Sequence, residues 1–530
     1  MSSSTTYSTE ALFMNYRLLS GRHVKRIAFL VLVIFVSIFL LYYVKTYVKT
    51  WLNAQHDALT LTVEAIQKAH RQRVESLEKQ ILALDKEIAL ENNKLHEQIS
   101  VVSDFLKNDL PHEFRRRLEQ MQKTLHSLAV PRFKHRPETS HLDCRRLFHK
   151  DQHYIDEVGR SRIALVESTV LDMDCESVRL RVLPRFPLPT TGYGIAFARI
   201  VNTDYEFVEE QLRVSYSPEN HYCYHVDSKS PAVFRERISK LSSCLPNVYL
   251  TKDYLDINGQ IGRNTNFAHM ACLKILQKKG SWQYVILQQT HDIVIRTNEE
   301  LKRIFQALNG TNDIQIDPCP TENYEQSMKW DAESLGVFHK STYRPPAKAL
   351  KTPLIIKKGA VQNAVSREAV EWMIRVNLTK LIGQFNVGKQ AVDEMLMSSL
   401  QIADEWEMPG RFTKQCFMDD SVSYGGITRM VQWRKKDSEC KAGFLRHSVC
   451  VLGTEDLPFV AGYHHILVNK MMPTFDYGAI ACVSELLFNR TYLGQNDHPL
   501  DMTIYENLPT VRFHNGLNDT NLLCQNLHQL

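Results

Sequence analysis

An uninterrupted apolar run, IAFLVLVIFVSIFLLYYV, occupies Ile27–Val44 and contains no charged residue. As a helix, its eighteen residues would extend roughly 27 Å, close to the thickness of a thin secretory-pathway bilayer. Tyr42, Tyr43 and Lys45 stand where a cleavable signal peptide has small residues. The alternative, a buried core helix, is disfavoured because the run is apolar on every side. The run therefore predicts a permanent membrane anchor.

Charge and cysteine placement predict the orientation of this anchor. Lys45 and Lys49 follow the run closely, but more positive charges precede it: Arg17, Arg22, Lys25 and Arg26. This bias predicts a cytosolic tail at residues 1–26 and a lumenal remainder, which is a single-pass type II topology. All eleven cysteines lie on the predicted lumenal side, where disulfides form. So do the glycosylation sequons at Asn309, Asn377, Asn489 and Asn518.

The region after the anchor has the composition of a helical stem. It contains neither Cys nor Gly between residues 55 and 130, and apolar residues recur three and four apart at Val74, Leu77, Ile81, Leu84 and Ile88. The pattern fits either a coiled coil, through which two chains could associate, or one amphipathic helix lying on the lumenal domain. Prolines and charges in VPRFKHRPETSH mark a boundary. We assign 45–135 to the stem and 136–530 to the lumenal domain.

The lumenal domain alternates short apolar runs with helical patterns. YGIAFARIV (193–201) predicts a strand, DYEFVEEQLRVSY (204–216) an amphipathic helix, and HYCYHVD (221–227) a second strand ending at Asp227. Later segments repeat this alternation, so we expect an α/β fold with a mainly parallel sheet. Ligands of such sheets bind beyond the carboxyl ends of the strands, where Asp227 is expected.

Several enzyme classes are disfavoured by motifs that the sequence lacks. It has no glycine-rich phosphate loop, no H-E-x-x-H and no C-x-x-C, and its net charge of +5 gives no sign of a nucleic-acid partner. A lumenal α/β domain behind an anchor and stem instead suggests a sugar-nucleotide transferase. The Asp-x-Asp at Asp172–Asp174, a metal-binding pattern in many such enzymes, precedes the first strand and is misplaced. We therefore expect no metal or other cofactor.

Without a metal, protein cations must neutralise the charge on a leaving nucleoside diphosphate. Arg446 and Lys470 could do so, because arginine offers a fork of donors to phosphate oxygens and lysine a point charge. A disulfide between Cys440 and Cys450 would limit the freedom of the loop that carries the arginine. The residue types alone are equally compatible with two solvated side chains.

The motifs YCYHVDSKSP, SCLPNVYL, IRTNEEL, VSREAV, VDEMLMSSL, LRHSVCVLGTEDLP and HHILVNK resemble a known family. It is the core-2/I-branching β-1,6-N-acetylglucosaminyltransferase family, glycosyltransferase family 14, which also includes peptide O-xylosyltransferases. The resemblance implies a GT-A-like, Rossmann-like fold and an inverting reaction without a divalent metal. It also implies a UDP-sugar donor, a glycan or glycoprotein acceptor and a Golgi membrane location.

The resemblance also implies roles for particular residues. The catalytic base of the family matches Glu394, where it would remove the proton from the acceptor hydroxyl. Arg446 and Lys470 match the diphosphate-binding pair, Asp227 matches a uridine contact, and Trp433 matches an acceptor-site tryptophan. On residue type alone, Trp433 could equally belong to the core.

The cysteine pattern of the family implies four disulfides: Cys144–Cys482, Cys175–Cys244, Cys223–Cys272 and Cys440–Cys450. Cys319, Cys416 and Cys524 remain unassigned, and with an odd total at least one thiol is free or pairs between chains.

The sequence departs from the family at QQTHDIV, where the family usually has Cys-Gly-Gln-Asp-Phe-Pro; Asp292 is kept. The acceptor-contacting charges of the family should fall within IQIDPCPTENYEQSMKW, which differs from it. Three hypotheses therefore stay open: an N-acetylglucosaminyltransferase, the same fold using UDP-xylose or UDP-glucose, and a catalytically silent glycan-binding protein.

Overall fold

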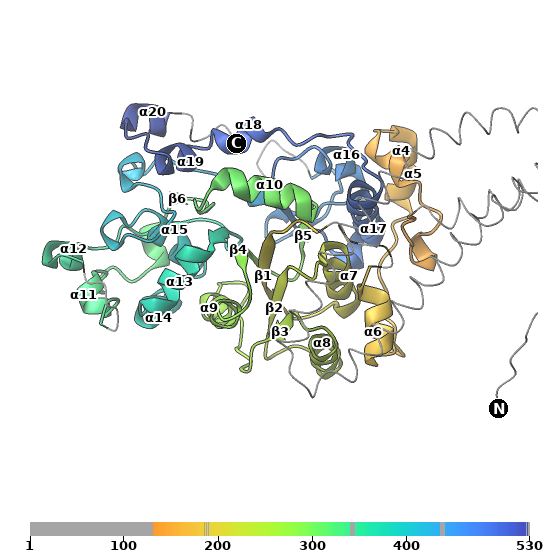
Figure 1. Ribbon diagram of the computed structural model, residues 1–530, viewed down its shortest axis with the longest axis horizontal. Coiled ribbons are helices and arrows are strands. Elements are labelled where there is room, and N and C mark those ends of the chain that lie inside the picture. Colours follow the sequence, from red (N-terminus) through yellow and green to blue (C-terminus); the bar gives the residue numbers. More distant parts are fainter. Residues whose placement is uncertain are drawn as a thin grey trace, which may run out of the picture. The chain divides into compact units, whose positions relative to one another are not determined.

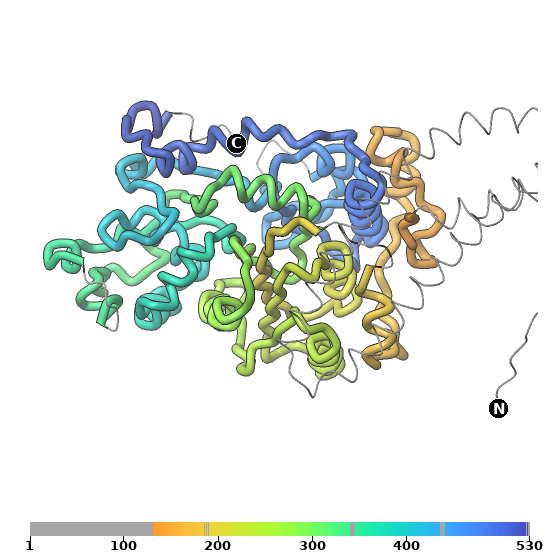
Figure 2. The backbone as a smooth tube through the Cα atoms, viewed as in Figure 1, coloured from red at the N-terminus to blue at the C-terminus, as the bar shows by residue number. Residues whose placement is uncertain are grey.

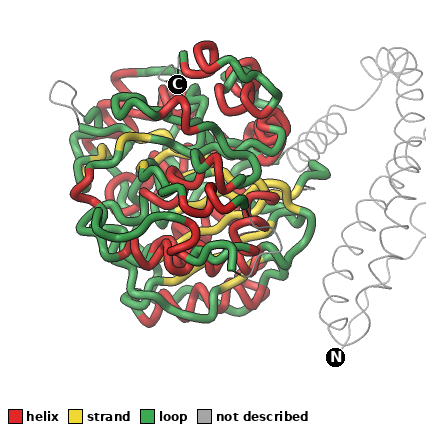
Figure 3. Tube along the Cα trace, turned by 90° about the vertical axis from the view of Figure 1, so that its left-hand side faces the viewer, coloured by secondary structure: helices red, strands yellow, loops and turns green. Residues whose placement is uncertain are grey.

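The computed structural model describes residues 131–527, apart from 185, 187, 189, 340–344, 435–439 and 526. These residues belong to one compact unit, Leu128–Leu530. Its strands lie in the interior, between helices on both sides (Figure 1; Figure 3). The predicted tail, the anchor at 27–44 and the stem as far as residue 130 fall outside the described residues. Within the described part, no helix is long and apolar enough to cross a bilayer.

The central sheet has the strand order β3-β2-β1-β4-β8. Its strands are β1 (Gly194–Val201), β2 (His221–Val226), β3 (Val248–Leu250), β4 (Trp282–Gln288) and β8 (Ala364–Ser366). The first four are parallel, and β8 pairs antiparallel with β4. The mainly parallel sheet expected from the sequence is thus confirmed. Because β2 and β4 flank β1 on opposite sides, the strand order reverses beside β1 and creates a switch point.

Successive side chains along β1 point to opposite faces of the sheet and so belong to two different parts of the hydrophobic core. Ile195 and Phe197 point to one face, and Ala196 and Ala198 to the other. The first face packs against α7 (Tyr205–Ser215), α8 (Ala232–Cys244), α10 (Asn298–Leu308) and α17 (Pro473–Tyr492). The second packs against α9 (Thr265–Leu276), α13 (Arg367–Arg375), α14 (Thr379–Asn386) and α15 (Met395–Gln401). Helices on both faces explain why β1 is buried throughout.

Three smaller ladders lie near the carboxyl ends of the parallel strands. A three-stranded sheet has the order β5 (Asp292–Val294), β12 (Leu467–Asn469) and β9 (Arg429–Val431). The two-stranded ladders are β6 (Asp317–Pro318) with β7 (Lys357–Lys358), and β10 (Leu445–Arg446) with β11 (Val449–Cys450). Of the residues that the sequence singles out, Arg446 ends β10 and Lys470 directly follows β12.

Shorter helices complete the unit: α4 (Cys144–Phe148), α5 (Gln152–Arg160), α6 (Cys175–Val182), α11 (Ala332–Leu335), α12 (Ala347–Lys351), α16 (Leu457–Val460), α18 (Met502–Glu506), α19 (Pro509–His514) and α20 (Thr520–Cys524). The segment from α18 to α20 runs along the side of the molecule where α10 lies, and α18 contacts α10 (Figure 2).

Five disulfides link distant parts of the described chain. Four are the pairs that the resemblance implies: Cys144–Cys482, Cys175–Cys244, Cys223–Cys272 and Cys440–Cys450. The fifth, Cys416–Cys524, joins two cysteines that the sequence left unassigned. It fastens α20 to the loop before β9, where Phe412, Phe417 and Leu523 form a small apolar cluster. Cys319 remains as a free, partly buried thiol.

Candidate active site

The loop after β4 is fixed at the switch point of the sheet. Thr290 Oγ1 donates a hydrogen bond to Asn202 Oδ1, just beyond β1, at 2.8 Å. His291 Nε2 lies 2.7 Å from Asp204 Oδ2. Thr290 and His291 belong to the QQTHDIV segment that departs from the family, yet both side chains have partners. The altered loop is therefore held in place by its own contacts.

Asp292 is the centre of a buried hydrogen-bond network at this loop. Its side chain is 0% exposed and accepts hydrogen bonds from Gln289 N at 2.6 Å, Gln362 Nε2 at 2.9 Å and Asn469 Nδ2 at 2.6 Å. Arg199 donates to its backbone carbonyl. A buried carboxylate with this many donors is fully satisfied. Asp292 therefore orients the loop and the residue before Lys470, and its full burial keeps it from contact with a ligand.

Asp227 directly follows β2, which ends one residue earlier than the predicted strand, at the same edge of the sheet. It is buried, and its Oδ1 accepts from Lys229 N at 2.9 Å and lies 3.1 Å from Lys229 Nζ. Its backbone N–H donates to Val201 O, which fixes it beside the end of β1. Asp227 thus lies in the crevice where α/β sheets bind ligands.

Arg446 and Lys470, here called the clamp, lie on adjacent segments. Arg446 ends β10, and the Cys440–Cys450 disulfide closes the base of that hairpin. Lys470 follows β12, and its carbonyl accepts from Leu452 N at 2.9 Å, which places it beside the strand that leaves the hairpin. The structure therefore brings together two cations that are 24 positions apart in the sequence.

Neither clamp residue has a carboxylate ion-pair partner among the described residues. Arg446 is exposed, and its Nη1 lies 3.7 Å from the sulfur of Met472. Burial and then the positive charge of Arg446 lower the pKa of Lys470, and Asp292 offsets part of this. Adjacent cations without a counter-ion repel one another, so this arrangement favours binding of an anion.

Trp433 lies beside the clamp hairpin. It forms a β-bridge with Val449, which pairs with Arg446 in the hairpin, so Trp433 and Arg446 share one face of a short ladder. Its side chain is 44% exposed, which excludes the core role that residue type alone left open. An exposed tryptophan at a site edge offers an apolar face to a sugar ring.

Arg429 connects the clamp to the other half of the site and was not identified from the sequence. Its guanidinium lies 6.0 Å from the centroid of the Trp433 ring, and Nη1 donates to Gln362 Oε1 at 3.0 Å. Burial lowers the pKa of Arg429; the nearby carboxylates of Asp292 and Glu394 oppose the shift. One guanidinium thus faces the Asp292 network and the candidate base.

Glu394 immediately precedes α15 but does not cap it, because its side chain makes no hydrogen bond to the first turn. Its Oε2 instead lies 3.4 Å from Lys358 Nζ on β7. The carboxylate is partly exposed and therefore available to a ligand. Glu394 therefore has no helix-capping role, and its carboxylate faces Lys358 and solvent.

Asp393, the neighbour of Glu394, has a different environment. It is buried beneath the loop at Gly262, where a β-carbon would overlap its carboxylate. Burial, and then the charge of Glu394, raise the pKa of Asp393 to about 7. Two adjacent carboxyl groups are thus differentiated by their environments, one enclosed and one open. Of the two, Glu394 is the one that a substrate can reach.

The segment expected to contact the acceptor lies next to Glu394. Asp317 on β6 pairs with Lys358 on β7, so IQIDPCPTENYEQSMKW begins beside the base. Cys319 follows directly, and burial raises the pKa of its thiol to about 12, which makes it a poor nucleophile. Lys357, whose side chain is 1% exposed, reaches the exposed Asp420 at 2.7 Å.

Other candidate sites in the described residues are already satisfied. Asp174 caps α6 and Asp172 accepts from the backbone of Asp174, so this Asp-x-Asp serves local structure. The cluster His135, Cys144 and Glu485 has metal-like spacing, but Cys144 is in a disulfide.

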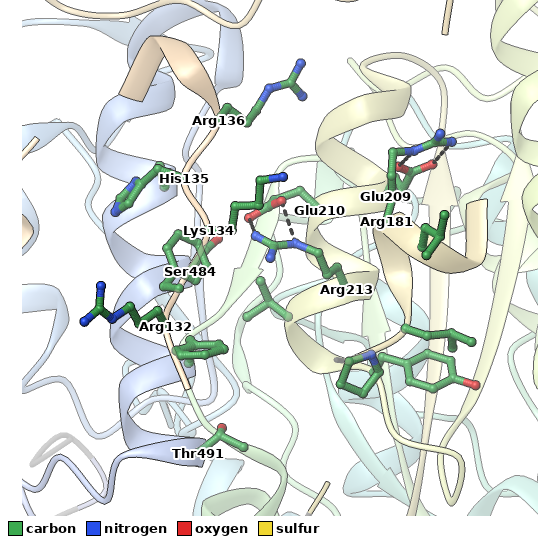
Figure 4. A pocket seen from close by; sticks show the side chains of 18 of the residues that line it. Arg132, Lys134, His135, Arg136, Arg181, Glu209, Glu210, Arg213, Ser484 and Thr491 are labelled. Atoms are coloured by element: carbon green, nitrogen blue, oxygen red, sulfur yellow. Dashed lines mark hydrogen bonds and ion pairs between the residues drawn. The ribbon is translucent and has the colours of Figure 1, made fainter. Parts of the chain in front are cut away.

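A cavity of about 380 Å³ lies beside α7 and α17, away from the switch point (Figure 4). Its charged walls include the ion pairs Arg181–Glu209 and Arg213–Glu210. Arg132 and Lys134 also line it and are exposed. The cavity is therefore set apart from the switch point by its place beside α7 and α17, not by a lack of cations.

Among the sequon asparagines, Asn309 and Asn518 are exposed, and Asn377 and Asn489 are partly exposed. Asn489 lies within α17, and the other three lie outside helices.

Comparison with known proteins agrees with this geometry. The model of the Core-2/I-Branching enzyme family matches residues 195–460, which include Asp227, Glu394, Trp433 and Arg446. The chain belongs to this family. It is therefore a glycosyltransferase by descent, and the resemblance seen in the sequence is confirmed.

Curated relatives point to one activity. The chain is 27% identical, over 64% of its length and 79% of the relative, to human "Beta-1,3-galactosyl-O-glycosyl-glycoprotein beta-1,6-N-acetylglucosaminyltransferase 3". The rat protein of that name is 26% identical over 64% of the chain and 79% of the relative. A bovine herpesvirus 4 enzyme named without the final number is 27% identical over 64% and 78%.

Proposed function

We propose that this chain is an inverting transferase that moves a sugar from a UDP-sugar to a hydroxyl of a glycan or glycoprotein, without a divalent metal. The observation that carries the proposal is the unpaired clamp of Arg446 and Lys470, which Arg429 links electrostatically to Glu394. Family membership and the names of the relatives favour N-acetylglucosamine as the donor sugar and a β-1,6 linkage.

In this mechanism one bond forms at the anomeric carbon as another breaks, and one proton moves from the acceptor to the enzyme. Glu394 accepts the proton of the acceptor hydroxyl as that oxygen forms a bond to the anomeric carbon. The bond from the anomeric carbon to the diphosphate breaks, and its electron pair leaves on the phosphate oxygen. Arg446 and Lys470 stabilise the negative charge that develops there. Attack from the face opposite the leaving group inverts the configuration. Trp433 and the segment IQIDPCPTENYEQSMKW (314–330) would orient the acceptor.

A donor panel tests this proposal. The full-length chain in detergent is given UDP-N-acetylglucosamine, UDP-xylose or UDP-glucose in excess EDTA, and released UDP is measured. We expect turnover with UDP-N-acetylglucosamine that persists in EDTA. Preference for another donor would reassign the sugar, and loss of turnover that manganese restores would overturn the metal-free clamp. Absence of hydrolysis or transfer with every donor would favour a silent glycan-binding protein.

We also propose that the chain is a type II Golgi membrane protein anchored by 27–44, with residues 136–530 in the lumen. The accessible sequons at Asn309 and Asn518 support this location. Glycosidase treatment of the protein from secretory cells should reduce its mass, and sealed vesicles should protect the catalytic domain from protease. An unchanged mass together with cytosolic protease access would contradict the topology.

A further inference from the structure

The tip of the clamp hairpin has a conformation that its residues rarely adopt. Arg446 pairs with Val449, so the turn between the two strands consists of His447 and Ser448 alone. Both have positive φ, at 51° and 62°. Turns of this kind usually contain Asn and Gly, because other side chains are strained there. Such strain is concentrated at ligand sites, and it raises the question of why an imidazole occupies this tip.

Contacts on several sides fix the tip beside the clamp. The Cys440–Cys450 disulfide closes the hairpin, and Ser448 O accepts from Arg434 N at 3.0 Å. Cys450 N donates to Gln432 O, which ties the second strand of the hairpin to the segment bearing Trp433. His447 therefore lies at the tip of a hairpin whose backbone is held by a disulfide and by hydrogen bonds to the segment bearing Trp433.

The charged groups that face His447 are cations. Arg446 acts on it from the hairpin itself and Lys470 from the segment after β12, while Arg434 borders the turn. No carboxylate among the described residues acts on the imidazole. Partial burial, then Lys470 and Arg446, lower the pKa of His447. The neighbouring cations therefore disfavour the protonated ring, and an anion bound beside Arg446, His447 and Lys470 would favour its protonation.

We propose that His447 is a third member of the diphosphate clamp, taking up a proton when the diphosphate binds and donating an N–H to a phosphate oxygen. This inference rests on the proposed function, because it deepens the same site. The proton comes from solvent and is released with the diphosphate. Binding should therefore tighten as pH falls from 8 to 6.5, while the chemistry at Glu394 is unaffected.

Calorimetry of UDP binding tests the proposal with full-length protein in detergent. Titrations at pH 7 in buffers of different ionisation enthalpy report the protons taken up. His447→Asn keeps a residue that tolerates positive φ but removes the imidazole, and His447→Lys supplies a permanent charge. His153→Asn, on exposed α5, is the matched control. The terminal phosphate of UDP titrates near pH 6 in every variant, so differences between variants isolate the residue.

On binding UDP, wild type and His153→Asn should take up the same number of protons. His447→Asn should take up fewer. At pH 6.5 His447→Asn should bind UDP up to roughly tenfold more weakly, and the difference should shrink toward pH 8. His447→Lys should bind without that pH dependence. Equal proton uptake in wild type and His447→Asn would overturn the inference. Unchanged UDP binding in Lys470→Ala would instead overturn the clamp itself, so the two failures are distinguishable.

Discussion

On one side of the site, Arg446 and Lys470 have no carboxylate ion-pair partner within the described part of the chain, whereas on the other side Glu394 is paired with Lys358. The clamp cations are two nearby like charges whose repulsion a bound diphosphate would relieve. The base already has a counter-ion, and the proton it accepts comes from the acceptor. Under the proposed mechanism, this difference predicts that donor binding depends on charge neutralisation and that acceptor activation depends on orientation. Each variant below should therefore affect one side and spare the other.

The largest effect is expected from Glu394→Gln. Glutamine keeps the size and hydrogen bonding of glutamate but cannot accept the proton, so turnover should fall by about 10² to 10⁴. UDP affinity should stay nearly unchanged, because Glu394 belongs to the opposite side. Initial rates beside calorimetric UDP titration measure both quantities. Full activity in this variant would remove Glu394 from the mechanism.

The clamp variants, unlike Glu394→Gln, should weaken the binding of UDP. Arg446→Ala and Lys470→Ala each remove a charge-assisted contact of roughly 1.5 to 3 kcal/mol, so UDP binding should weaken about ten- to a hundredfold. Turnover should fall as well, because the same contacts stabilise the leaving group. Arg145→Ala, an exposed arginine of α4 away from the hairpin, is the matched control. If Glu394→Gln and both clamp variants lost UDP binding equally, the cause would be general misfolding.

The pH dependence of stability tests the enclosed carboxyl of the base side. Asp393 has a pKa of about 7 in the folded chain, against about 3.9 when unfolded. Between about pH 4 and pH 7 only the folded state holds this proton, so its contribution to stability declines as pH rises, by at most about 1.4 kcal/mol per unit. Asp393→Asn removes this decline.

The unfolding midpoint of Asp393→Asn should therefore rise relative to wild type between pH 5 and pH 8, as followed by thermal denaturation of the full chain. Asp456, whose pKa burial raises to about 6, adds a decline of the same sign to both proteins and cancels in the comparison. A constant difference between variant and wild type across this range would show that Asp393 does not titrate there.

The smallest effect is expected from Lys358→Met. The ion pair with Glu394 is partly exposed and 3.4 Å long, so solvent screens it. Turnover should fall severalfold through loss of orientation, UDP affinity should not change, and Lys358→Arg should restore the rate. Lys348→Met, on exposed α12, controls for loss of a positive charge. A change in UDP affinity would show that the two sides are not separable.

The sequence predicted the regular parts of this structure well. The predicted strand at 193–201 corresponds to β1, and the helix at 204–216 corresponds to α7, because period and length identify buried strands and amphipathic helices. Asp227 was placed correctly from the same pattern. Roles for the clamp and Glu394 came from resemblance, since charged residues on short irregular ladders have no periodic signal.

Contacts across long sequence distances could not be predicted. Arg429 bonds to Gln362 and interacts electrostatically with Glu394 only because β9 pairs with β12 beside the loop of Asp292. Lys358 had one usable signal, two adjacent lysines inside the apolar run PLIIKKGAV. The Cys416–Cys524 disulfide had none, because three cysteines remained and spacing alone does not specify which two pair.

The Cys416–Cys524 disulfide also affects the order in which the two sides can mature during biosynthesis. The clamp side needs the chain as far as Cys482, whose disulfide with Cys144 holds α17, the helix that packs against the first face of the sheet. The base side rests on Lys357 and Lys358, and Lys357 contacts Asp420 in the loop that this disulfide fastens to α20. Cys524 must therefore be synthesised and oxidised before the loop that carries Asp420 is held in place. A nascent chain would acquire its nucleotide-binding half earlier than a firmly held acceptor surface.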